Sequence, residues 1–162
     1  MLMKKKLCLL IIALMAVVSA NAQFEAGKKY GNLSLSGLNL SYNGSEKANF
    51  GIQAKGGYLI QDNVMLLGNV GYQKSTDMPS YVNIGAGARY YIEQNGIFLG
   101  AGLNFVHAGG SRDDFMPSIH VGYAFFLCRN VTIEPEIYYN QSFKSHKDYS
   151  TIGFRLGVGV YL

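Results

Sequence analysis

Apolar and polar residues alternate with a period of two along most of the chain after residue 29. This alternation is typical of β-strands that have one apolar face. The expected strands cover residues 30–42, 49–60, 64–74, 81–92, 97–108, 118–128, 131–143 and 150–162. Tight turns at 61–63, 93–96 and 129–130 alternate with longer, more charged connections. The pattern therefore predicts an all-β, up-and-down antiparallel meander of eight strands.

The two faces of these strands differ in an unusual way. In the last segment, TIGFRLGVGVYL, six apolar residues share one face, and the other face carries three glycines, Arg155 and Tyr161. A soluble barrel would present a polar exterior rich in Lys, Glu and Thr, whereas a glycine-rich face with few charges suits a narrow, filled interior. We therefore expect the apolar face to contact lipid and the sheet to close into a barrel, because lipid-exposed backbone groups must all be paired.

Two strands carry irregularities. The alternation changes phase within 30–42, which predicts a β-bulge at Ser36 and Gly37. Pro135 lies inside 131–143, so it marks either a second bulge near the rim or a misplaced strand boundary. Aromatic residues gather towards the strand ends, which predicts two interfacial belts. The belt near the short turns would contain Tyr58, Tyr90, Tyr91, Phe125, Phe126 and Tyr161.

The first 22 residues have the three parts of a secretory signal peptide. Three lysines precede an apolar run that is too short to span a membrane as a helix, and Ala20-Asn21-Ala22 follows. We predict cleavage between Ala22 and Gln23, which leaves one domain at 23–162. Losing three lysines lowers the formal charge from +4 to +1, so the composition gives no support for a nucleic-acid partner. Cys128 is then the only cysteine, which excludes an intrachain disulfide and a thiol pair for a metal.

The sequence combines a signal peptide, four hairpins, alternating short turns and long loops, and a last strand that ends the chain. In these features it resembles the small eight-stranded outer-membrane β-barrels of Gram-negative bacteria, the OmpA transmembrane domain and OmpX-like group. The resemblance implies an integral outer-membrane monomer with both termini in the periplasm. It also implies contact with outer-membrane lipid and lipopolysaccharide, and biogenesis through periplasmic chaperones and the barrel-assembly machinery.

The last residues carry a more local match to that family. Its members end on an assembly signal of the form Gly-x-x-apolar-x-apolar, and Gly157, Val160 and Leu162 fill these places. Two positions depart from the pattern: Leu162 stands where the family usually has an aromatic residue, and Leu156 stands where it usually has a polar one.

The inward face of the expected barrel carries most of the candidate site residues. They are Lys55, Arg89, His120, Glu134, Glu136 and Arg155. Charges in a narrow lumen are tolerated when they are paired, so we predict an ion-pair network that plugs the barrel. The protein would then have a structural or surface-interaction role through its loops, with no cofactor and no metal. A small-solute pore is the alternative.

A lipid A-modifying enzyme is the second alternative, because some barrels of this size carry a catalytic His and Ser near the outer rim. The candidate pairs are Ser118 with His120, Ser145 with His146, and His107 with Ser111. None has a catalytic signature or a carboxylate that is obviously placed to orient the histidine, so we predict no catalytic residues. Asp113 and Asp114 are expected in a solvated loop rather than at a cation site.

Overall fold

The computed structural model describes residues 24–41, 46–75, 80–93, 96–109, 112–143 and 150–162. These residues form an antiparallel sheet. Its strands are β1 (Lys29–Ser41), β2 (Glu46–Gln61), β3 (Val64–Ser75), β4 (Tyr81–Tyr91), β5 (Ile97–Ala108), β6 (Arg112–Tyr123), β7 (Phe125–Phe126), β8 (Val131–Asn140) and β9 (Thr151–Tyr161). Within the described residues there is no helix long and apolar enough to cross a membrane.

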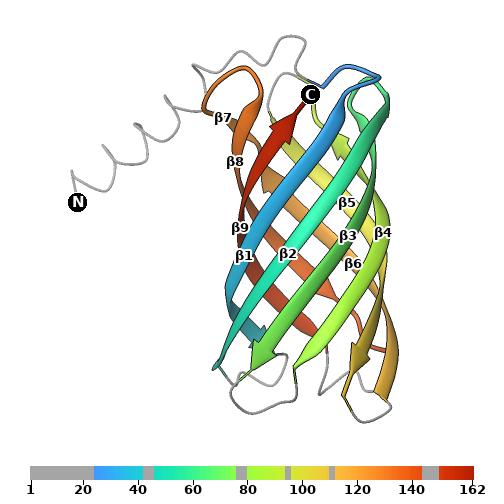
Figure 1. The fold of residues 1–162 in the computed structure, drawn as a ribbon, viewed down its shortest axis with the longest axis vertical. Helices are drawn as coiled ribbons and strands as arrows, with labels where there is room; N and C mark the ends of the chain where they lie inside the picture. The colour runs from blue at the N-terminus through green and yellow to red at the C-terminus, as the bar shows by residue number, and fades with distance from the viewer. Residues whose placement is uncertain (1–23, 42–45, 76–79, 94–95, 110–111, 144–149) are drawn as a thin grey trace, which may run out of the picture.

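The sheet closes on itself. Its strand order is β6-β5-β4-β3-β2-β1-β9-β8-β7, and β6 also pairs with β8 (Figure 1). The two-residue strand β7 continues the course of β6 beyond Ala124. The wall of the barrel therefore consists of eight strands around its circumference. The prediction of a closed, eight-stranded antiparallel barrel is confirmed.

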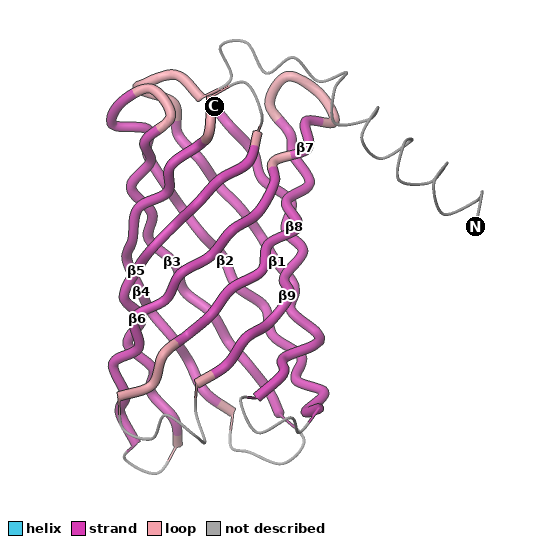
Figure 2. The backbone as a smooth tube through the Cα atoms, turned by 180° about the vertical axis from the view of Figure 1, so that it is seen from behind, coloured by secondary structure: helices cyan, strands magenta, loops and turns pink. Residues whose placement is uncertain are grey.

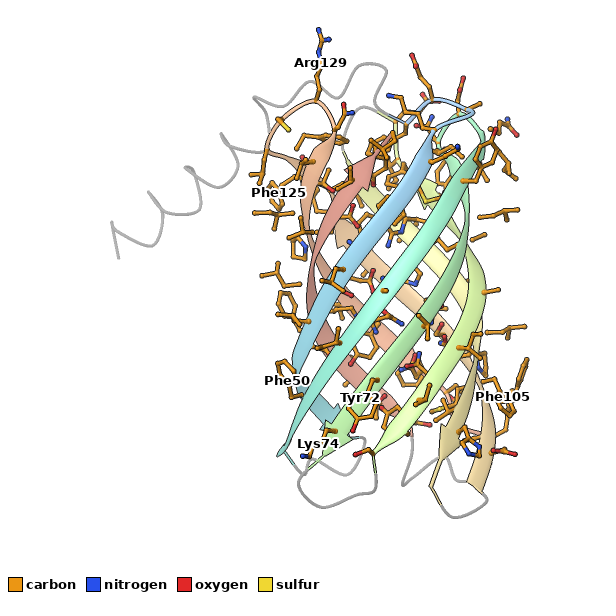
Figure 3. The ribbon with its side chains drawn as sticks, in the orientation of Figure 1. Phe50, Tyr72, Lys74, Phe105, Phe125 and Arg129 are labelled. Carbon is orange, nitrogen blue, oxygen red and sulfur yellow. The ribbon has the colours of Figure 1, made fainter. Side chains whose placement is uncertain are left out.

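The outer wall is apolar between its two ends. Large apolar side chains such as Ile84 and Ile119, each 61% exposed, project outwards from the middle of their strands. Figure 3 shows Phe50, Tyr72 and Phe105 on the outside near the loop end of the barrel, and Phe125 on the outside near the other end. The inward positions between them are buried or half-buried. This division follows from the alternation of side chains along a strand.

The first described residues and the C-terminus lie at the same end as the short turns (Figure 2). The last residue is paired there with the start of β1: Lys29 N donates to Leu162 O over 2.7 Å, and Leu162 N donates to Lys29 O over 2.8 Å. The predicted signal peptide, 1–22, and the cleavage point between Ala22 and Gln23 lie outside the described residues.

The sixth strand differs from the prediction. It begins at Arg112, six residues before the expected start at 118, and pairs with β5 from Ala108 onwards. Residues 112–117 also alternate, with Phe115 exposed and Met116 buried. Two aspartates and a proline conceal this pattern, because such residues usually indicate a loop. The prediction of a loop at 109–116 is therefore wrong for residues 112–116, which belong to β6.

The two predicted irregularities have different outcomes. The pairing of β1 shifts between Ser36 and Leu38 against both β2 and β9, which confirms the bulge. Pro135 lies within β8 without any shift, because Ile133 stands opposite Phe125 and Glu136 opposite Gly122 in the same register. The proline has no N–H to donate, so it interrupts the pairing between β8 and its neighbour without a bulge.

Arginine substitutions at two heights on the outer face of β3 test whether that face contacts lipid. We expect Val70→Arg, in the middle of β3, to lower the free energy of unfolding in lipid vesicles by about 2–4 kcal/mol, since a charge near the bilayer midplane is poorly solvated. Val64→Arg, on the same face at the end of the same strand, should cost about 0–1 kcal/mol. Urea titrations monitored by tyrosine fluorescence measure both, and equal costs would contradict a lipid-facing wall.

Candidate functional site

Five charged side chains from four strands meet inside the barrel. They are Lys55 on β2, Arg89 on β4, Glu134 and Glu136 on β8, and Arg155 on β9. Each occupies an inward position, because the strand alternation places its neighbours in sequence on the outer wall. Four of the five are buried, and Arg155 is half-buried.

Glu136 is shared by three basic groups. Its Oε2 lies 2.7 Å from Lys55 Nζ and 3.2 Å from Arg89 Nη2, and its Oε1 lies 2.6 Å from Arg155 Nη1. Glu136 and Arg155 are direct cross-strand partners in the register of β8 and β9. The side chain of Glu136 is only 3% exposed, so these contacts replace the water that a carboxylate would otherwise bind.

Glu134 is bound by one arginine and several hydroxyl groups. Arg89 Nη1 lies 3.0 Å from its Oε2, and the Tyr30 hydroxyl donates to the same oxygen over 2.5 Å. On its other oxygen, Oε1, it accepts hydrogen bonds from Thr132 Oγ1 at 2.8 Å and from the Tyr161 hydroxyl at 3.0 Å. Both carboxylate oxygens are therefore satisfied away from water, as a buried charge requires.

Arg89 connects the two carboxylates. Besides its two ion pairs, its guanidinium lies over the ring of Phe98, with 3.9 Å between Cζ and the ring centroid. Arg155 is placed in a similar way over Tyr138, at 4.1 Å. An aromatic face attracts a cation, so both rings add to the attraction of the ion pairs. The charged network thus consists of Lys55, Arg89, Glu134, Glu136 and Arg155.

His120 does not join the charged network. Its Nε2 is buried without a hydrogen-bond partner, and its ring lies against Gly100 on the neighbouring strand. A Cβ at position 100 would come within 2.0 Å of His120 Nε2, so only glycine leaves room for the ring. The pattern of the sequence places His120 in the lumen, but it cannot reveal which neighbours the ring meets.

A second cluster of side chains fills the short-turn end of the lumen. Tyr91 and Tyr161, which we expected in the interfacial belt near the short turns, are buried inside and share a hydrogen bond of 2.8 Å. Phe126 packs against the same buried cluster, whereas Tyr58 and Tyr90 face outwards. The three inner aromatics lie at the predicted end of the barrel, but inside it and not in an outer belt. Their position in the alternation gave a usable signal, because Tyr91 shares a face with Arg89, and Tyr161 with Arg155.

The residues of the expected assembly signal lie on both faces of β9. Gly157 faces inwards, where an added Cβ would approach Asn32 Nδ2 to 2.7 Å. Val160 lies on the outward face, and Leu162 is 73% exposed at the end of the chain.

The candidate catalytic pairs are placed differently from one another. Ser118 accepts a hydrogen bond of 3.1 Å from Asn104 Nδ2. His107 and Asp113 are exposed cross-strand partners, with 2.6 Å between His107 Nδ1 and Asp113 Oδ1. The sequence did not reveal this carboxylate, because Asp113 was expected in a loop. Ser111, Ser145 and His146 lie outside the described residues. In the described part of the chain, no group of three or more His, Cys, Asp and Glu side chains could hold a metal ion.

Several solved structures have a similar fold. Neisserial surface protein A (NspA) is 22% identical with a TM-score of 0.65, over 83% of this chain and 97% of that chain. The N-terminal β-barrel domain of Pseudomonas aeruginosa OprF is 15% identical with a TM-score of 0.65, over 85% and 98%. The attachment invasion locus protein Ail of Yersinia pestis is 16% identical with a TM-score of 0.54, over 85% and 99%. The structural likeness establishes a common fold.

No curated protein matches the sequence. The family model of the outer membrane protein beta-barrel domain matches residues 7–161, nearly the whole chain. Together with a closed barrel and an apolar outer wall, this match supports a location in the outer membrane of Gram-negative bacteria. The chain therefore belongs to the outer membrane protein beta-barrel domain family.

Proposed function

We propose that this protein is a non-conducting, non-catalytic outer-membrane barrel, whose lumen is plugged by the charged network and whose role is structural or is exerted at the cell surface through its loops. The observation that carries the proposal is the sharing of Glu136 by Lys55, Arg89 and Arg155 within the lumen. A hydrated ion would have to displace several charge-assisted contacts to pass this level.

The dimensions of the barrel support a plug. The basic and acidic partners come from strands that are not all neighbours, since Lys55 on β2 and Arg89 on β4 both reach β8 across the lumen. The interior of an eight-stranded barrel is just wide enough for side chains to fill. Removing one partner of such a buried pair leaves an uncompensated charge, so the contacts hold one another in place.

The loops at the end opposite the termini are the part of the protein that would face the cell exterior. We infer this orientation, with both termini periplasmic, from the location of the short turns at the terminal end. Two similar structures support a surface role: one is named a surface protein, and one, Ail, was solved with the heparin analogue sucrose octasulfate. Rigid barrels commonly carry their binding residues on loops. Lipopolysaccharide is the partner nearest to these loops in the membrane.

Biogenesis would follow the route of the family. We propose that the barrel-assembly machinery reads Gly157 and Val160 in β9 and Leu162 directly after it, once periplasmic chaperones have delivered the unfolded monomer. The location of this strand supports the proposal, because β9 pairs with β1 and so completes the wall.

Planar-bilayer recordings test the plug directly. We expect the purified barrel to give no single-channel steps, since the charged network fills the lumen. Regular steps that disappear or change size in Glu136→Gln or Arg155→Gln would instead identify a small-solute pore that passes through this site.

Substitution of Glu136, the shared carboxylate, tests its contribution to the stability of the barrel. Glu136→Gln leaves Lys55 and Arg155 without an anion, so we expect it to lower the free energy of unfolding by about 3–5 kcal/mol. Glu93→Gln, which makes the same change at an exposed turn residue, is the matched control and should leave stability unchanged within about 0.5 kcal/mol. Urea titration in vesicles measures both; equal stability of the two variants would refute the role of Glu136.

The native cysteine reports the orientation. Cys128 is exposed. It belongs to the turn between β7 and β8, which lies at the same end of the barrel as the C-terminus (Figure 1). We expect a membrane-impermeant thiol reagent to leave it unlabelled on intact cells and to label it once the outer membrane is permeabilised. Labelling on intact cells would place the termini outside.

A further inference from the structure

We propose that residues 24–28 form an N-terminal cap that closes the short-turn mouth of the barrel, with the Phe24 side chain as its plug. The cap seals the lumen from the periplasmic end. The charged network lies further inside and contacts the aromatic partners of the cap through Tyr161 and Tyr91. The seal is assigned to the cap alone, so the inference does not depend on the network blocking conduction.

The Phe24 ring is built into the mouth. It is 6% exposed, although it precedes the first strand. It stacks on Tyr91 with 3.8 Å between ring centroids and an interplanar angle of 16°, and it meets Phe126 and Tyr161 edge-on at 5.6 Å each. These three partners come from β4, β7 and β9, so the ring joins strands from different sides of the opening. Such aromatic pairs are stabilised beyond the area they bury.

The backbone of the cap is bonded to the end of β2 and the turn that follows it. Phe24 O accepts from Asn63 N over 2.9 Å, and Asp62 Oδ1 accepts from Ala26 N over 2.9 Å. Gly27 N donates to Leu59 O over 2.7 Å, and Lys28 O accepts from Leu59 N over 2.9 Å. The segment is thus an extension of the wall that folds inwards, rather than a loose tail.

Two residues of the cap and its anchor adopt the left-handed backbone region. Asn63, at φ 65°, is the only non-glycine residue with positive φ among those described. Its N–H donates to Phe24 O, and its carbonyl accepts from Tyr91 N over 2.8 Å, so this one residue links the backbone of the plug to the strand on which the plug stacks. Gly27, at φ 92°, turns the segment back into β1. Such conformations persist where surrounding contacts hold them.

A buried residue beneath the plug can report whether water enters the lumen. Met65 is fully buried in the cluster that contains Phe24, and its Sδ lies 3.9 Å from the Tyr91 hydroxyl. In a Cys128→Ser, Met65→Cys parent, a small charged thiol reagent can label the new cysteine only if water reaches it. We expect slow labelling of this parent in vesicles or detergent.

Removal of the plug should open this path. We expect Phe24→Ala to increase the labelling rate of the parent at least tenfold. Phe125→Ala removes an outward-facing phenylalanine at the same end, whose ring pairs with Tyr123 rather than with the cap, so it should leave the rate unchanged. Glu136→Gln in the charged network should also leave the rate unchanged. An equal acceleration by Glu136→Gln would overturn the assignment of the seal to the cap.

A backbone variant tests the same proposal without altering the plug. An added Cβ at Gly27 meets nothing closer than the Tyr58 hydroxyl at 3.9 Å, so Gly27→Ala acts through its positive φ alone. We expect it to accelerate labelling as well, by less than Phe24→Ala. Heat-modified migration on unboiled gels identifies the folded fraction of every sample. Folded Phe24→Ala and Gly27→Ala barrels that label at the parent's rate would refute the cap, whatever the conductance recordings show.

Discussion

Hydrocarbon offers no hydrogen-bond partner to a peptide group, and this constraint determines the architecture of the whole chain. Every strand must be paired on both edges within the membrane, so β1 joins β9, and β6 joins β8. Closure with so few strands makes the interior narrow. The narrow interior in turn explains the glycines on the inward face, since Gly100 makes room for His120 and Gly157 for Asn32. The apolar wall and the polar lumen are two results of one requirement.

The charged network depends on the register of a single strand. Both carboxylates, Glu134 and Glu136, lie on β8 two residues apart, and the three cations reach them from β2, β4 and β9. A slip of one residue would turn both carboxylates towards lipid and every cation would lose its partner. The network therefore contributes to the specificity of strand pairing as well as to stability, which suits a wall whose glycine-rich strands carry little packing information of their own.

Much of the barrel was predictable from local pattern, and the rest depended on contacts across the lumen. Period-two alternation revealed the strands, the bulge at Ser36 and the inward position of Arg89, because these depend on neighbours in sequence. The early start of β6 was missed because Asp113, Asp114 and Pro117 resemble a loop in composition. The burial of Phe24 has no periodic signal, since the residue precedes the first strand and is held by residues 39 or more positions away. Asp113 beside His107 was hidden for the same reason as the start of β6.

In the part of the chain that the structure describes, the short strand β7 has one unpaired edge. Among the described residues, β7 pairs only with β8. The strand β5, which is the other neighbour of β6, begins at Ile97, opposite Tyr123, and so does not extend as far as Phe125. An open edge can recruit a strand from another chain, which is the usual route to aggregation of sheet proteins. Here the edge consists of Phe125 and Phe126 alone. Two residues offer a foreign strand too few groups for stable pairing, so the hairpin can extend beyond the wall without making the barrel prone to self-association.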